Sequence, residues 1–303
     1  MNFELKNEDL TLTFKEIGGE LSSIKDKDGL EYLWQGDKNY WSGQAPVLFP
    51  ICGSLRNNKT IYGDNEISLK EGQMPRHGLV RKLPFKGEKI SASEISFTIV
   101  SSDEMYQKFP YHFELKTNYR LIGKTITIEY QVKNLENKYK MPFTIGAHPA
   151  FNCPLMPGEA YEDYYLEFEK NETCTSAKVF AESGLVDLDQ RQEFLKNEKI
   201  LPLDYDLFKD DTLLLDQLTS RRVSLKSNNH QKGLSLNLLD FPFLVLWSTA
   251  NHGPFIALEP WQGVSTSKNE SDKFIEKKNM QMLEPYHLNE QVKILSYQII
   301  IHS

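Results

Sequence analysis

Residues 253–263 read Gly253-Pro254-Phe255-Ile256-Ala257-Leu258-Glu259-Pro260-Trp261-Gln262-Gly263. The apolar run predicts a buried β-strand that ends at Pro260 and leads into a Trp-Gln-Gly turn. A charged carboxylate is costly to bury unless it is paired or used in chemistry, so Glu259 at the end of such a strand suggests a catalytic group. The alternative is a glutamate that ends the strand and points into water.

Alternating apolar and polar residues predict antiparallel strands along most of the chain. The alternation is clearest in residues 94–100, 113–121 and 126–132, and shorter runs occur at 10–14, 234–238, 244–247 and 292–301. Asp28-Gly29 and Gly63-Asp64-Asn65 predict hairpin turns. Residues 157–232 are more polar, and within them residues 190–195 predict a short helical piece.

The fold class follows from this succession of short strands with little helix. Strands separated by turn signals about every 8–12 residues are typical of all-β folds. We therefore predict one large antiparallel β-sandwich. No change in composition, Ser/Gly linker or fixed-period repeat divides the chain, so residues 1–303 are expected to form a single domain.

The composition points away from nucleic-acid and membrane partners. Against 42 acidic residues stand 35 Lys and Arg, giving a net charge of −7 with no basic cluster for a phosphate backbone. No apolar run reaches the roughly 18 residues of a membrane-spanning helix, and the N-terminus has no signal-peptide pattern. Cys52, Cys153 and Cys174 are too few and scattered for a disulfide framework or zinc knuckle. We expect a cytoplasmic protein.

Two of the seven histidines lie in segments typical of functional sites. His77 lies between Pro75 and Gly78, in a loop with little surrounding bulk. His148 follows Gly146-Ala147 and precedes Pro149, where a strand opens into a stiff bend. Both are expected at the rim of a sheet, aimed across a concave surface. A surface or core role is the alternative for each, as it is for His112, His230, His252, His287 and His302.

Five segments stand out in this order along the chain: Leu48-Phe49-Pro50-Ile51-Cys52-Gly53, His77-Gly78-Leu79-Val80-Arg81, Phe109-Pro110-Tyr111-His112-Phe113, Gly146-Ala147-His148-Pro149-Ala150-Phe151 and Leu258-Glu259-Pro260-Trp261. Together they resemble the aldose 1-epimerases, also called galactose mutarotases, and within them the bacterial LacX-like branch. Each is a weak motif alone, but the ordered set is specific and spans nearly the whole chain.

The resemblance implies an open β-supersandwich that binds a sugar in a groove on its concave face, without a metal or organic cofactor. It implies that Glu259 takes the proton from the anomeric hydroxyl while His148 protonates the ring oxygen. His77 would hold or polarise that oxygen. An aspartate that binds sugar hydroxyls matches Asp211, with Asp210 as the alternative. The implied activity interconverts the α and β anomers of a hexose or hexose phosphate.

One departure from the family bears on sugar specificity. Galactose mutarotases usually carry Asn-Arg after the first loop's glycine, whereas this chain reads Gly53-Ser54-Leu55-Arg56-Asn57-Asn58. Asn57 keeps the asparagine, and Arg56 is displaced by two residues, which preserves its face on a strand. Both are expected to bind substrate, together with Arg81 and Trp261.

Arginines and aromatic residues near the same rim leave further alternatives. Arg56, Arg76 and Arg81 could receive a sugar phosphate, because guanidinium groups match phosphate oxygens, although simple solvation is the expectation for Arg76. An apolar platform for a sugar could come from the aromatic side chains of Trp261, Trp247 and Phe151. For all three, a place in the core is the alternative.

Two other functions remain open. His77, His148 and Glu259 could form a two-histidine, one-carboxylate iron site, although neither histidine has the usual local His-x-Asp/Glu pairing. The protein could also be a carbohydrate-binding module without catalysis.

Overall fold

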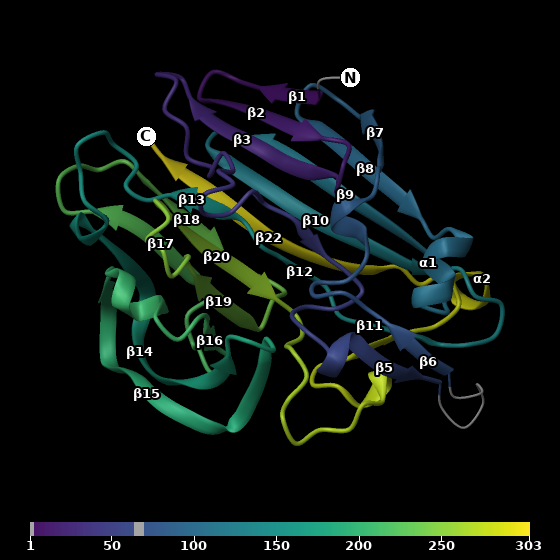
Figure 1. The fold of residues 1–303 in the computed structure, drawn as a ribbon. Coiled ribbons are helices and arrows are strands. Elements are labelled where there is room, and N and C mark those ends of the chain that lie inside the picture. The colour runs from purple at the N-terminus through teal and green to yellow at the C-terminus, as the bar shows by residue number, and fades with distance from the viewer. Residues whose placement is uncertain (1–2, 64–69) are drawn as a thin grey trace.

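The computed structural model describes residues 3–63 and 70–303, which form mostly antiparallel strands (Figure 1). The strands are β1 (Phe3–Lys6), β2 (Leu10–Lys15), β3 (Glu20–Asp26), β4 (Val47–Leu48), β5 (Lys59–Tyr62), β6 (Lys70–Gln73), β7 (Lys86–Lys89), β8 (Glu94–Val100), β9 (Phe113–Ile122), β10 (Thr125–Asn134), β11 (Met141–Phe143), β12 (Gly146–Ala147), β13 (Ala150–Asn152), β14 (Tyr164–Phe180), β15 (Leu185–Pro202), β16 (Leu213–Leu215), β17 (Arg222–Ser227), β18 (Gly233–Asn237), β19 (Phe243–Trp247), β20 (Phe255–Trp261), β21 (Gln281–Leu283) and β22 (Lys293–His302). The helices are α1 (Asp103–Lys108) and α2 (Tyr286–Asn289), and 3₁₀ turns occupy Arg56–Asn58, Val80–Lys82, Tyr161–Asp163, Tyr205–Phe208 and Phe274–Glu276. Within the described residues, neither helix is long and apolar enough to cross a membrane.

A 15-stranded sheet forms the main layer in the part of the chain that the structure describes. Its order is β4-β12-β20-β19-β16-β14-β17-β18-β22-β10-β9-β8-β7, with β13 on β20 and β15 on β14. The β1-β2-β3 sheet covers one end of it, where Phe3 meets Phe97 at a ring-centroid distance of 5.2 Å and Phe14 meets Tyr119 at 4.8 Å. The predicted all-β sandwich is confirmed.

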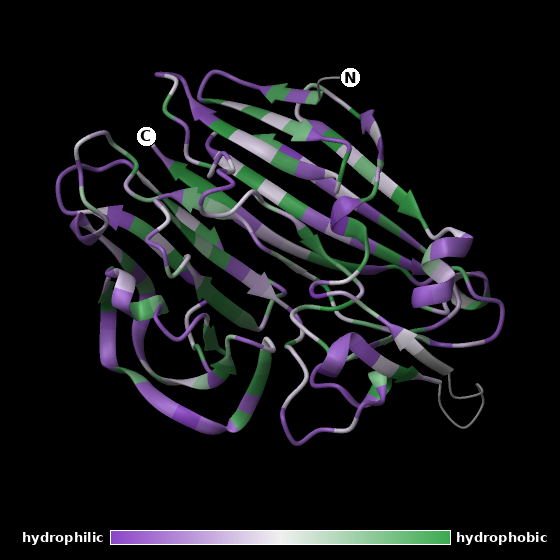
Figure 2. Ribbon diagram, in the orientation of Figure 1, coloured by the Kyte–Doolittle hydropathy of each residue, from purple (hydrophilic) through white to green (hydrophobic). Residues whose placement is uncertain are grey.

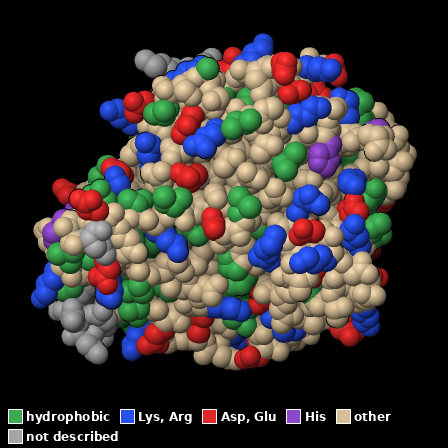
Figure 3. Space-filling view, turned by 180° about the vertical axis from the view of Figure 1, so that it is seen from behind, with side chains coloured by type: hydrophobic (Ala, Val, Ile, Leu, Met, Phe, Trp, Pro, Cys, Tyr) green, Lys and Arg blue, Asp and Glu red, His purple; other side chains and the backbone are tan. Residues whose placement is uncertain are grey.

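The meander β8-β9-β10 and the last strand β22 follow the predicted alternation closely. In β10, residues pointing to the core are buried and their neighbours are half-buried throughout. Figure 2 shows the same alternation as green and purple bands along these strands. Apolar side chains from one face of each strand therefore build the core between the two layers. Charged side chains of both signs are interspersed on the face seen in Figure 3.

Three local predictions need correction or lie outside the described residues. The helical piece predicted at residues 190–195 is wrong, because these residues continue strand β15. Strands β14 and β15 form the longest hairpin and shift register at four places, so their polar sequence loses a strict period of two. The turn predicted at Gly63-Asp64-Asn65 falls largely on residues 64–69, which are not described.

Strand β20 extends one residue past its predicted end, through Pro260 to Trp261. The backbone N–H groups of Leu258 and Gln262 donate to the carbonyls of Pro149 (3.1 Å) and Ile145 (3.0 Å) across the strand. Pro260 lies between these two donors, opposite the bend that separates β12 from β13. A proline is tolerated there because the neighbouring chain turns away and no ladder hydrogen bond is needed.

Candidate active site

Glu259 lies on β20, the third strand from one end of the main sheet, with its side chain inside the protein. On β20, Ile256 and Leu258 face the main hydrophobic core. Glu259 and Trp261 point to the other face, where they line a cavity of about 260 Å³. Only 2% of the Glu259 side chain is exposed, so the alternative that it points into water is wrong.

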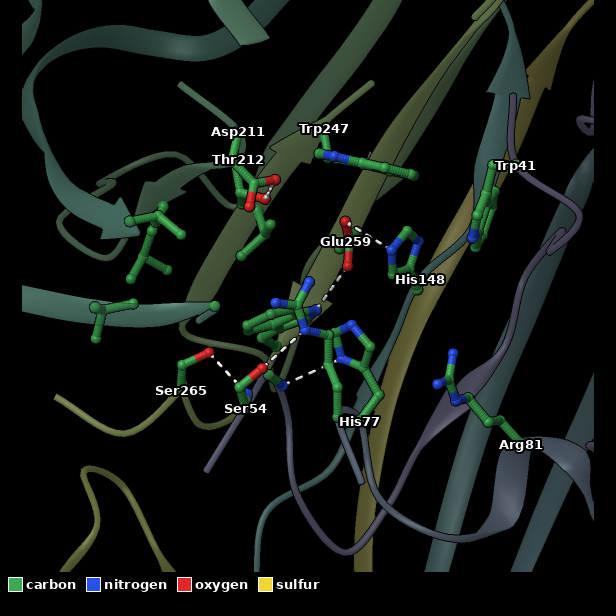
Figure 4. Close-up of a pocket in the computed structure, with 18 residues that line it drawn as sticks. Trp41, Ser54, His77, Arg81, His148, Asp211, Thr212, Trp247, Glu259 and Ser265 are labelled. Atoms are coloured by element: carbon green, nitrogen blue, oxygen red, sulfur yellow. Dashed lines mark hydrogen bonds and ion pairs between the residues drawn. The ribbon is translucent and has the colours of Figure 1, made fainter. Parts of the chain in front are cut away.

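His148 lies directly beside this carboxylate (Figure 4). It occupies the bend between β12 and β13, where its backbone N–H donates to the carbonyl of Pro46 at 3.1 Å. Its Nε2 lies 3.3 Å from Oε1 of Glu259, and the histidine side chain is 9% exposed. The other carboxylate oxygen, Oε2, accepts a hydrogen bond of 3.0 Å from the indole N–H of Trp261.

His77 reaches the same cavity from a strained loop. Its φ is +66°, a conformation that few residues other than glycine adopt, and two hydrogen bonds with Gly53 hold it. The His77 N–H donates to the Gly53 carbonyl at 2.7 Å, and Nδ1 accepts from the Gly53 N–H at 3.1 Å. Since Nδ1 is an acceptor, the neutral ring carries its proton on Nε2. Figure 4 shows that nitrogen facing Glu259 and His148.

Two glycines make this loop possible. Gly78 has a φ of +79°, and a Cβ there would lie 2.0 Å from the carbonyl oxygen of Phe49. Gly53 has a φ of +71°, and a Cβ there would lie 2.0 Å from the hydroxyl oxygen of Ser265. A side chain at either position would clash with these atoms and strain the backbone that holds His77.

Burial shifts the proton affinities of these groups. Desolvation raises the pKa of Glu259 well above its ordinary value, and the nearby charge of Asp211 adds to this, while the Trp261 hydrogen bond opposes it. Desolvation lowers the pKa of His148 to about 3, assisted by the charge of Arg81. It also lowers the pKa of His77, together with the charges of His148, Arg81 and Arg76. The cavity therefore favours an uncharged carboxyl and two neutral imidazoles.

Asp211 lines the cavity on the side opposite His77, whereas Asp210 is exposed. The Asp211 carboxylate accepts a hydrogen bond of 3.1 Å from the hydroxyl of Thr212. Burial raises the pKa of Asp211, while Thr212, the charge of Arg76 and the indole of Trp247 oppose this. Of the two aspartates that the sequence leaves open, Asp211 is the one placed to contact a ligand.

The predicted arginines divide into two groups. Arg81 lines the cavity, and so does Arg76, which was expected to be simply solvated. Arg56 points elsewhere: its Nε donates to Asp272 at 2.9 Å and its terminal nitrogens donate to the carbonyls of Ser267, Lys268 and Glu270. Asn57 is exposed in the 3₁₀ turn, outside the cavity lining. The displacement of Arg56 therefore does not preserve its face, because residues 56–58 form a turn and not a strand.

Several lining residues were not predicted. Trp41 stacks on the imidazole of His148, and Ser54 is also part of the cavity lining. Val179, Gly184 and Val186, at the tip of the β14-β15 hairpin, form another part of the wall. Of the predicted aromatic platform, Trp261 and Trp247 line the cavity but Phe151 is fully buried in the main core. The available sequence signal for Trp41 was its place a few residues before Pro46 and Pro50, in a segment that leads to Gly53.

The alternative iron site has limited geometric support. His77, His148 and Glu259 do share the cavity, with the two imidazole centroids 5.6 Å apart. The described residues nevertheless contain no group of three His, Cys, Asp or Glu side chains arranged to hold a metal ion.

The family model for aldose 1-epimerase matches residues 1–281. The chain belongs to the aldose 1-epimerase family. It is therefore an isomerase of mutarotase type, as its resemblance to this family predicted. Two curated relatives from Lactococcus lactis subsp. lactis, the plasmid and chromosomal forms of protein LacX, are each 55% identical over 272 residues, covering 90% of this chain and 91% of the relative.

Solved structures of this aldose 1-epimerase fold agree with the match. A galactose mutarotase related enzyme from Lactobacillus acidophilus superposes with a TM-score of 0.91 at 26% identity, covering 100% of this chain and 98% of the other. A galactose mutarotase-like protein from Lactobacillus casei gives a TM-score of 0.89 at 28% identity, with both chains fully covered. The galactose mutarotase-like sandwich predicted for this epimerase is thus confirmed.

Proposed function

We propose that this protein interconverts the α and β anomers of a hexose by acid/base ring opening, with Glu259, His148 and His77 as catalytic residues. The observation that carries the proposal is the 3.3 Å contact between His148 Nε2 and Glu259 Oε1 in the cavity that both side chains line. Anomer exchange needs a base at the C1 hydroxyl and an acid at the ring oxygen, and a carboxylate with an imidazole supplies both. A cavity of about 260 Å³ suits one small ligand.

The proton balance follows from treating Glu259 and His148 as one pair that holds a single transferable proton. When the pair is ionised, the carboxylate takes the C1 hydroxyl proton and the imidazolium gives its proton to the ring oxygen. The C1–O5 bond breaks, a C1 aldehyde forms, and the pair becomes neutral. Burial favours this neutral state, as the raised pKa of Glu259 and the lowered pKa of His148 indicate. Rotation about C1–C2 and the reverse transfers give the other anomer.

The remaining cavity residues are assigned to binding the sugar. His77 donates from Nε2 to the ring oxygen, because Nδ1 is occupied by the Gly53 N–H. Asp211 accepts hydrogen bonds from sugar hydroxyls on the opposite side of the cavity. Trp261 and Trp247 face the apolar C–H surface of the sugar ring. Arg56 and Asn57 lie outside the cavity lining and have no part in this proposal.

A phosphorylated hexose is the second candidate substrate. Arg56 and Arg191 form ion pairs with aspartates, whereas the Nε of Arg76 donates to the uncharged hydroxyl of Ser54 at 2.8 Å. Arg76 and Arg81 both line the cavity and can offer guanidinium groups to a phosphate. This favours testing hexose 6-phosphates beside free hexoses.

Polarimetry tests the proposal directly. Fresh α-D-glucose, α-D-galactose and their 6-phosphates are followed with the wild type, Glu259→Gln and, as a matched control, Glu8→Gln at an exposed glutamate. We expect Glu259→Gln to lose about 10²- to 10⁴-fold in rate on the preferred sugar and Glu8→Gln to keep the full rate. Equal rates for all three proteins on every sugar would reject the catalytic assignment and favour a binding protein. Loss of wild-type rate after metal chelation would favour the iron-site alternative.

We also infer a cytoplasmic location. Cys52, Cys153 and Cys174 are all buried free thiols, which suits a reducing compartment. Cell fractionation with an antibody against the protein tests this, and recovery outside the cytoplasmic fraction would contradict it.

A further inference from the structure

The imidazole of His148 lacks the hydrogen bond that usually orients a catalytic histidine. Such rings are normally aimed by a carboxylate or carbonyl bound to the nitrogen remote from the substrate. Here Nδ1 of His148 is buried and has no hydrogen-bond partner among the described residues. Nε2 is directed at Glu259, which is itself a reacting group. The plane of the ring must therefore be set by packing.

Trp41 provides that packing. Its ring lies nearly parallel to the imidazole of His148, with 4.6 Å between centroids and 25° between planes. The edge of Trp247 closes a second side at 5.4 Å and 82°, and His77 a third at 5.6 Å and 87°. Figure 4 shows Trp41 standing beside His148 on the side away from Asp211. Of these three rings, Trp41 is the one stacked face to face on the imidazole.

The loop that carries Trp41 is shaped to hold the indole in place. The Trp41 carbonyl accepts hydrogen bonds from the indole N–H of Trp34 at 2.8 Å and from the Asp37 backbone at 3.1 Å. A Cβ on Gly43 would lie 2.3 Å from a carbon of the Trp41 ring, so this glycine leaves the space that the indole fills. Asn251 donates to the Asn39 carbonyl at 2.8 Å, which ties the loop to the turn before β20.

We propose that Trp41 is the positioning residue for His148: its indole face fixes the imidazole plane, excludes water from it and keeps Nε2 aimed at Glu259 and the sugar's ring oxygen. The catalytic meaning of this role rests on the proposed function, but the positioning is a property of the folded protein. The ionisable groups around His148 are Glu259 on β20 and His77 and Arg81 in residues 77–81. Trp41 and Trp247 contribute no charge.

The proton affinity of His148 reports on this role without any turnover. Desolvation is the main reason that its pKa is lowered to about 3, and the Trp41 face is part of the cover that excludes water. Truncation of the indole admits water to the ring and restores hydration of the imidazolium. The pKa of His148 then rises toward the ordinary value of about 6.5.

NMR titration of the histidine ring signals, with His148→Gln to assign the His148 resonance, tests the proposal. From about pH 4 to pH 8 we expect no His148 titration in the wild type, a titration with its midpoint inside this range in Trp41→Ala, and behaviour close to wild type in Trp41→Phe. Tyr40→Ala is the matched control, because Tyr40 lies on the same loop but packs on Trp34. A His148 signal in folded Trp41→Ala that stays untitrated over this range would overturn the proposal.

Kinetics separate positioning from sugar binding. For Trp41→Ala we expect kcat to fall about 10- to 100-fold with KM changed less than about threefold, and Trp41→Phe to recover most of the loss. A rise in KM at constant kcat would identify Trp41 as a sugar platform and reject the positioning role. If the wild type itself has no epimerase activity, the proposed function fails, while the titration still decides the role of Trp41.

Discussion

Two buried carboxylates, Glu259 in the cavity and Asp26 at the end of β3, show how differently the same side-chain chemistry is used. Their side chains are 2% and 0% exposed. Asp26 accepts from the ammonium of Lys232 at 2.7 Å and from two backbone N–H groups, of Asp28 and Leu30, at 3.0 Å each. Among the described residues, Glu259 has one neutral indole N–H as its donor and a neutral imidazole beside it.

The difference in partners decides the proton affinity. Burial raises the pKa of both groups, but at Asp26 the Lys232 ammonium and backbone N–H groups more than offset it, so its pKa is lowered. At Glu259 the Trp261 hydrogen bond does not offset the effect of burial, so the pKa of Glu259 is raised. Asp26 therefore stays ionised, and its hydrogen bonds to Asp28 and Leu30 stabilise the turn after β3. Glu259 is held ready to exchange a proton.

The largest expected effect is on stability: neutralising Asp26 should lower the free energy of unfolding, whereas neutralising Glu259 should not. Asp26→Asn should lose about 2–3 kcal/mol of unfolding free energy at neutral pH, because it removes the 2.7 Å ion pair and leaves Lys232 the longer 3.5 Å ion pair with Asp28. Glu259→Gln should keep or raise the free energy of unfolding, because an ionised Glu259 is unfavourable in the folded protein. Urea unfolding monitored by tryptophan fluorescence measures both, and polarimetry should show Asp26→Asn active. If Glu259→Gln were destabilised and Asp26→Asn were as stable as the wild type, the assigned difference between the two carboxylates would be contradicted.

These effects have opposite pH dependence. The folded pKa of Asp26 is depressed, so its stabilisation is present above its unfolded pKa and is lost as the pH falls through the folded value. The folded pKa of Glu259 is raised, so its ionisation costs stability as the pH rises. The stability gap between wild type and Asp26→Asn should therefore close in acid.

A smaller effect, on the pH dependence of activity, is expected from removing the hydrogen bond that Trp261 donates to Glu259. Trp261→Phe removes the indole N–H that lowers the pKa of Glu259, so the acid limb of the pH–rate profile should move to higher pH. The pH dependence of kcat/KM measures the shift. An acid limb that moves down would show that the indole does not stabilise the carboxylate.

The smallest effect is expected at Asp211. Asp211→Asn removes a charge that raises the pKa of Glu259, so the acid limb should move to lower pH, opposite to Trp261→Phe. KM should rise about fivefold through a weakened hydrogen bond to the sugar. Asp210→Asn, at the exposed neighbour, is the control. Equal effects of the two substitutions on KM would contradict the choice of Asp211.

The meander β8-β9-β10 and strand β20, which carries Glu259, were predictable because their sequence patterns are local. Strand β8 covers residues 94–100 as predicted, since an alternating face needs only neighbouring residues to define it. His77, His148 and Glu259 were likewise marked by small residues and prolines around them. Their convergence in one cavity came from the family resemblance and not from periodicity.

Other features depend on contacts that no local pattern encodes. Register shifts in β14 and β15 hide the longest hairpin and suggest a helix at residues 190–195. Arg56 was placed in the groove by strand geometry, but residues 56–58 form a 3₁₀ turn that sends the guanidinium toward residues 267–272. Trp41 stacks on His148 although more than a hundred residues separate them in the chain.

A carbon-13 NMR titration of the Glu259 carboxyl tests the central claim most directly, with Glu259→Gln identifying the signal and Asp26 as the internal reference. The account predicts a midpoint well above 4.5 for Glu259 and one below 3.8 for Asp26 in the same folded sample. A Glu259 midpoint at or below 4.5 would mean that the buried carboxyl is an ordinary stabilised anion, and would contradict its role as the base in ring opening.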